Sequence, residues 1–76
     1  MPDMSNEQFE TVKARLRRIL RRVGWTIHLL HRRDRWYARA AKRDVTGKQH
    51  YKYLASLPKI ADMDTNEIVA ILPPVA

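Results

Sequence analysis

The hydrophobic period of this chain changes at Gly24, and that change limits which elements can form on either side of it. Before Gly24, apolar residues recur at helical spacing, at Phe9, Val12, Leu16, Ile19, Leu20 and Val23. After it, apolar and polar side chains alternate, which is the period of a strand. Glycine readily takes the left-handed conformation that ends many helices. The sequence therefore predicts a helix over about residues 6–23, followed directly by strands.

The start of this helix is marked by its local sequence. Ser5 and Gln8 have the spacing of a capping box, in which the side chain of each residue bonds the backbone amide of the other. Met4 and Phe9 occupy the apolar positions that flank such a box. We therefore expect the helix to begin directly after Ser5.

The same pattern recurs near the C-terminus. Asp64 and Glu67 form a second capping box, again flanked by apolar residues, Met63 and Ile68. The apolar residues that follow predict a short helix, which ends at the prolines at positions 73 and 74 because proline cannot continue a helix.

Three runs between these helices have the composition of strands: residues 25–33, 35–43 and 48–56. A tight turn at Arg33 and Asp34 joins the first two, and a turn containing Gly47 joins the last two. The predicted fold class is therefore α+β: a helix, a three-stranded antiparallel meander and a short C-terminal helix. The 76 residues form a single domain, with flexible ends expected at 1–4 and 73–76.

Alternation assigns the faces of this sheet. The face expected to pack against the first helix carries Trp25, Ile27, Leu29, Trp36, Ala38 and Ala40. The opposite face is expected to carry Thr26, His28, Tyr37, Arg39, Arg43 and either Lys52 or its neighbours. Two registers stay open for the third strand: either Tyr51 and Tyr53 face inward, or His50, Lys52 and Leu54 do.

Positive charge is concentrated in the middle of the chain. Residues 13–52 carry fourteen of the fifteen Lys and Arg residues but only two of the eight acids, and the net charge is +7. Such clustering is the electrostatic footprint of a nucleic-acid-binding protein. We therefore expect a nucleic-acid partner, with DNA favoured over RNA and duplex DNA as the expected form.

Two surfaces could make this contact. A β-ribbon fits the major groove of DNA, where Arg can bind guanine through two hydrogen bonds, whereas tyrosine rings act mainly on the bases of single strands. On the first helix, like charges four residues apart repel, and a bound anion would offset that cost. The candidate nucleic-acid-binding residues are Arg15, Arg18, Arg22, Arg32, Arg33, Arg35, Tyr37, Arg39, Arg43, Lys48 and Lys52.

The run "RWYARAAKRDVTGKQHYKYL" resembles the arm-type, AP2-like DNA-binding domain of tyrosine recombinases and integrases. The residues that match in order are Trp36, Ala38, Arg39, Asp44, Gly47, Lys48 and Lys52. The resemblance extends over about residues 25–72 and implies a three-stranded sheet inserted in the major groove, with a helix packed behind it. It also implies an accessory role in a phage or mobile element. The chain departs from the family in its first helix and in the segment "SLPKIADMD" after the third strand.

Other classes of function find little support. The chain has no cysteine, no long apolar run and no catalytic motif, so we expect a cytoplasmic protein that is not an enzyme, with no cofactor, no bound metal and no membrane contact. The alternative function is a small adaptor or inhibitor whose basic surface docks an acidic protein partner. The apolar C-terminal segment "IVAILPPVA" favours that alternative or a homodimer, and either a monomer or a homodimer is expected.

Overall fold

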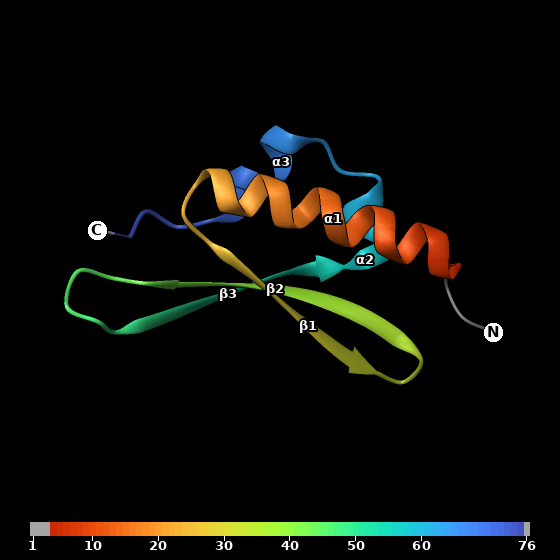
Figure 1. Ribbon diagram of the computed structural model, residues 1–76, viewed down its shortest axis with the longest axis horizontal. Coiled ribbons are helices and arrows are strands. Elements are labelled where there is room, and N and C mark those ends of the chain that lie inside the picture. The colour runs from red at the N-terminus through yellow and green to blue at the C-terminus, as the bar shows by residue number, and fades with distance from the viewer. Residues whose placement is uncertain (1–3, 76) are drawn as a thin grey trace.

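The computed structural model describes residues 4–75. Its elements follow in the order α1 (Asn6–Arg22), β1 (Thr26–Arg32), β2 (Arg35–Arg43), β3 (Gln49–Ser56), α2 (Leu57–Ala61) and α3 (Thr65–Ile71) (Figure 1). The predicted α+β layout is confirmed, and α2 is an additional short helix. Of the ends expected to be flexible, residues 1–3 and 76 lie outside the described residues, while Met4 and Val75 pack against the core.

Both predicted capping boxes are present. At α1 the Ser5 hydroxyl accepts a hydrogen bond from the Gln8 amide (3.2 Å), and the Gln8 side chain accepts one from the Ser5 amide (3.0 Å). Asp64 and Glu67 make the equivalent pair at α3. Gly24 follows α1 with a φ of +83°, the left-handed conformation that lets the chain turn directly into β1.

The sheet is antiparallel with strand order β1-β2-β3. Arg33 and Asp34 join the first two strands with φ values of 49° and 63°, as a two-residue hairpin turn with positive φ at both positions requires. The second hairpin turn contains Gly47 at a φ of +89°. The two predicted turns are therefore confirmed.

A β-bulge decides the register that the sequence left open. Ala38 pairs with Ala55 and Arg39 pairs with Tyr53, so Leu54 is the extra residue on β3. Leu54 and Ala55 are both buried in the core although they are consecutive. Tyr51 and Tyr53 therefore face away from the helices. Lys52 pairs with Ala40 and therefore lies on the helix side of the sheet. Its expected place on the open face is corrected.

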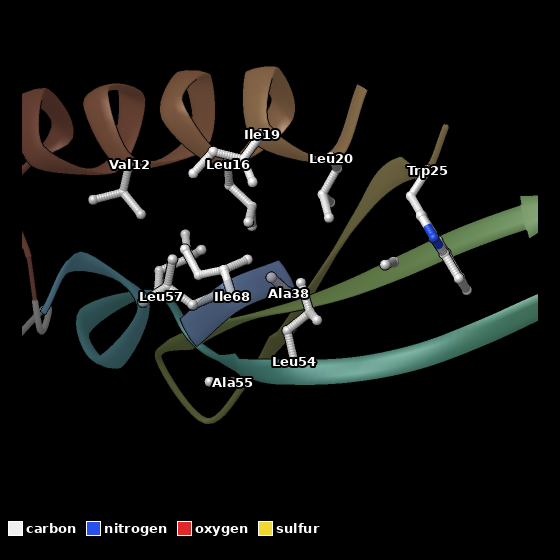
Figure 2. Close-up of a cluster of buried hydrophobic side chains, with 12 residues drawn as sticks. Val12, Leu16, Ile19, Leu20, Trp25, Ala38, Leu54, Ala55, Leu57 and Ile68 are labelled. Carbon is white, nitrogen blue, oxygen red and sulfur yellow. The ribbon is translucent and has the colours of Figure 1, made fainter. Parts of the chain in front are cut away.

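All three helices lie on one side of the sheet (Figure 1). The core between them and the sheet contains Val12, Leu16, Ile19, Leu20, Trp25, Ala38, Ala40, Leu54, Ala55, Leu57, Ile60 and Ile68. Figure 2 shows the α1 side chains pointing toward the sheet and toward Leu57 and Ile68. Ala38 and Ala40 of β2 are fully buried on this side, and their small side chains leave room for the helices to approach the sheet closely.

Arg15 ties α1 to the segment that joins α2 and α3. Its guanidinium donates hydrogen bonds to the carbonyl oxygens of Ile60 (3.3 Å) and Met63 (2.7 Å). The Ile60 carbonyl near the end of α2 also accepts a hydrogen bond from the Met63 amide (3.1 Å), and the half-buried guanidinium is a second donor to it. Arg15 was a candidate for nucleic-acid binding, but the structure places its charge in this internal contact.

Candidate nucleic-acid interface

The side of the sheet that faces away from the helices is called the outer face here. By register its side chains are Thr26, His28, Leu30 and Arg32 of β1, Arg35, Tyr37, Arg39, Ala41 and Arg43 of β2, and Gln49, Tyr51, Tyr53 and Ser56 of β3. No helix among residues 4–75 covers this face (Figure 1). The three strands thus carry basic side chains and aromatic rings on the same side, and this open surface is about three side chains wide.

Arg39 lies at the centre of the outer face. It is on the middle strand and pairs with His28 on one side and with Tyr53 on the other. Its guanidinium carbon is 4.3 Å from the centre of the Tyr51 ring, which is a cation–π contact. Its Nε is buried and has no hydrogen-bond partner among residues 4–75. This donor is therefore shielded from water while the rest of the half-buried side chain still reaches the surface.

Aromatic rings surround this cation. Tyr37 and Tyr53 have ring centres 6.2 Å apart, and His28 meets Tyr51 edge to face at 6.0 Å. Tyr51 and Tyr53 each keep 53% of their surface exposed, which is unusual for a large ring in a small domain. Half-exposed rings on a rigid sheet can stack on a planar ligand.

A shallow depression of about 580 Å³ adjoins Arg39 at the β1–β2 end of the outer face. Its lining combines rings, apolar surface and cations, from Leu30, Arg32, Arg33, Tyr37, Arg39 and Tyr53. Arg35 lies next to it, directly across from Arg32 in the register. Five of the predicted binding residues, namely Arg32, Arg33, Arg35, Tyr37 and Arg39, are therefore brought together here.

The opposite end of the outer face also carries positive charge. Arg43 ends β2, where its Nε donates a hydrogen bond to the Gln49 side chain (3.4 Å), and the exposed Lys48 follows in the hairpin turn. Cations therefore lie at both ends of the outer face, with the aromatic rings between them.

Asp44 organises the turn that carries Lys48. Its carboxylate accepts hydrogen bonds from the Thr46 hydroxyl, from the His50 ring at 2.7 Å and from the amides of Thr46 and Lys48. These donors, the Thr46 hydroxyl first and the His50 ring second, hold the pKa of Asp44 far below its usual value. Four hydrogen bonds thus hold the turn together, and its acidic group is already occupied by internal donors.

Three predicted residues lie elsewhere. Lys52 is on the helix side of the sheet by register, although it is exposed. Arg18 and Arg22 lie on the exposed side of α1, away from the sheet. Together with Arg15, these residues do not belong to the outer face.

Some outer-face residues were absent from the predicted site. Tyr51, Tyr53 and His28 contact or adjoin Arg39, yet only Tyr37 was named among the rings. The sequence signal for these rings was the alternation of Tyr51 and Tyr53, which puts both on one face of the strand. Which face that is depends on the bulge at Leu54.

Comparison with protein families, with curated proteins and with solved structures finds no match for this chain. Within residues 4–75, no group of three or more His, Asp or Glu side chains is placed to hold a metal ion. None of the helices in that range combines the length and the apolar character needed to cross a membrane.

Proposed function

We propose that this protein is a small, non-enzymatic nucleic-acid-binding protein whose outer face contacts the nucleic acid. The observation that carries the proposal is the environment of Arg39, a cation stacked on Tyr51 in the middle of an uncovered sheet, with a buried and unpaired Nε. An unpaired buried donor costs the free protein stability. Such an arrangement is expected where a ligand completes the site.

Charge and shape support a polyanionic ligand. The cations at the two ends of the outer face, Arg32, Arg33, Arg35, Arg43 and Lys48, can contact phosphates, which position a nucleic acid without reading its sequence. The rings between them can stack on bases, and each stacked base contributes about 1–3 kcal/mol. Arg39 lies among the rings, where it can bind a base edge.

The rings favour unpaired bases as the contact. Stacking requires access to the flat face of a base, which a duplex covers with neighbouring bases and a single strand exposes. Duplex DNA, read by the sheet in the major groove, is the form that the resemblance of residues 25–72 to the arm-type domain implies. From the same resemblance we propose an accessory role in a phage or mobile element. Separately, we propose that the protein is cytoplasmic.

Binding of one oligonucleotide sequence, as a single strand and as a duplex, tests the proposal. Fluorescence anisotropy across a salt series should show tight binding at low salt that weakens steeply. If about four to six phosphates are neutralised, the slope of log K against log salt is about −4 to −5 for the duplex and about −3 to −4 for the single strand. We expect the single strand to bind more tightly than the duplex at equal length.

Variants of Tyr53 give the matched comparison. Tyr53→Ala removes an exposed ring and should cost about 1–3 kcal/mol of single-strand binding, whereas Tyr53→Phe keeps the ring and should bind nearly as well as the native protein. Lys59→Ala removes an exposed cation from α2, on the helix side of the sheet, and is the control for a general loss of charge. Absence of binding to either form at low salt would overturn the proposal and favour the acidic protein partner.

A further inference from the structure

The exposed side of α1 carries a second concentration of positive charge. We call it the α1 ridge, and it consists of Arg17, Arg18, Arg21 and Arg22, all exposed. Within residues 4–75, none of these four guanidinium groups has a carboxylate within ion-pair distance. The four arginines and Ala14 line a depression of about 570 Å³, because Ala14 leaves a gap between the longer side chains.

The α1 ridge faces away from the outer face of the sheet. The apolar stripe of α1, which includes Leu16 and Leu20, is fully buried against the sheet (Figure 2). Arg18 is two residues from each of them, which is about 200° around a helix, so it lies on the opposite side. The whole of α1, about 10–12 Å in diameter, and the sheet lie between the two basic surfaces.

The close spacing of these arginines costs stability, which a bound anion would offset. Arg17 and Arg21 are four residues apart, as are Arg18 and Arg22, and like charges at this spacing destabilise a helix. The helix dipole offsets this cost for Arg21 and Arg22, which lie in the last turn, but much less for Arg17 and Arg18, one turn earlier. Phosphate groups would offset it for all four, and a depression lined by guanidinium groups can receive one.

We infer that the α1 ridge is a second phosphate-binding surface, so that one molecule joins two segments of nucleic acid. The inference rests on the proposed function, which assigns the first segment to the outer face. A stiff duplex seated on the α1 ridge cannot bend around the domain to the outer face, because its persistence length is about 150 base pairs. A short single strand on the outer face cannot reach the α1 ridge when it is too short to pass around the domain. The two surfaces therefore hold different segments, the outer face through bases and phosphates and the α1 ridge through phosphates alone.

A bridging assay tests this inference. Beads carry a short single strand, too short to wrap around the domain, and a labelled short duplex is added with the protein. The native protein should retain the duplex on the beads, with a maximum at intermediate protein concentration and a decline in excess protein. Sedimentation of the mixture should show one protein molecule with two oligonucleotides.

Charge reversal on the α1 ridge separates the two proposals. Arg18→Glu with Arg22→Glu should abolish duplex capture, since loss of each phosphate contact weakens binding about tenfold at moderate salt. The same variant should still bind one oligonucleotide, with an affinity that remains sensitive to Arg39→Met. Arg18→Lys with Arg22→Lys keeps the charge and should keep the bridge. A circular dichroism melt confirms that each variant is folded.

Each other outcome has a distinct meaning. A native protein that binds one oligonucleotide but never two overturns the bridging inference and leaves the proposed function standing. A complex with two protein molecules and two oligonucleotides also overturns it, because dimerisation then makes the bridge. A protein that binds no oligonucleotide overturns the proposed function itself. Loss of all binding on charge reversal, with no effect of Arg39→Met, would move the single binding site from the outer face to α1.

Discussion

The guanidinium of Arg39 stacks on the ring of Tyr51 at 4.3 Å, across two neighbouring strands of an uncovered sheet face. The contact holds Arg39 against the sheet and leaves its Nε buried without a partner among residues 4–75. A cation–π contact near the surface contributes about 0.5–1 kcal/mol, whereas an unpaired buried donor costs about 1–3 kcal/mol. The environment of Arg39 therefore costs the free protein more stability than it contributes, as expected for a side chain that binds a ligand.

Arg39→Met tests that balance. Methionine keeps the apolar stem over Tyr51 and removes the unpaired donor, so the free energy of unfolding should be unchanged or higher by up to about 1 kcal/mol. Nucleic-acid affinity should fall by about 1–3 kcal/mol. Urea unfolding and anisotropy measure the two effects on the same preparation. A loss of stability greater than about 2 kcal/mol with unchanged affinity would make Arg39 a structural residue.

Arg15→Gln, unlike Arg39→Met, should lower the stability of the protein. Its guanidinium bonds the carbonyls of Ile60 and Met63, and loss of these charged hydrogen bonds should lower the unfolding free energy by about 2–3 kcal/mol. Arg15→Lys should recover only part of this, since an ammonium cannot span both carbonyls as the planar guanidinium does. Arg17→Met, at an exposed position two residues away, is the control and should change stability by no more than about 0.5 kcal/mol.

Asp44→Asn should change how stability depends on pH. The pKa of Asp44 is lowered in the folded state by the Thr46 hydroxyl and then by the His50 ring, so the carboxylate stabilises the fold above the unfolded pKa of about 3.9. That contribution is lost as the pH falls below this value toward the folded pKa. Urea unfolding should therefore show the native protein more stable than the variant at neutral pH, with the difference shrinking below about pH 4.

The control for this prediction is Asp62→Asn, an exposed carboxylate without a side-chain hydrogen bond among the described residues. It should give little difference from the native protein at neutral pH. A difference for Asp44→Asn that stays constant down to pH 2 would contradict the prediction, because the stability difference would then not depend on ionisation of the carboxylate.

Leu16→Ala tests the core beneath the sheet. Leu16 is fully buried, so truncation should cost about 2–5 kcal/mol, much of the stability of so small a domain. Val45 is 87% exposed in the β2–β3 turn, and Val45→Ala should change the unfolding free energy by no more than about 0.5 kcal/mol. Equal effects at the two positions would contradict the assignment of the core.

Features that depend on neighbouring residues could be predicted from the sequence. The capping boxes at Ser5 and Asp64 and the left-handed Gly24 each require only a few adjacent residues, and the structure confirms all three. The two sheet faces also followed from alternation as far as Ala38 and Ala40, because period 2 holds along an unbroken strand.

The rest depends on contacts between distant segments. Pro58 breaks the strand pattern, but proline is also favoured in the first turn of a helix, and α2 begins there. The bulge at Leu54 forms where two consecutive residues both enter the core, which no local pattern specifies. Arg15 resembles the other arginines of its helix, and only its bonds to residues more than forty positions away distinguish it.

An NMR titration of ¹⁵N-labelled protein with a short single-stranded oligonucleotide shows whether the outer face binds nucleic acid around Arg39. We predict the largest chemical-shift changes at the amides of residues 28, 37–41 and 51–53 and at the Arg39 Nε–H, which should gain a hydrogen bond on binding. Saturable binding with changes confined to α1, and with the Arg39 Nε–H unmoved, would contradict the claim.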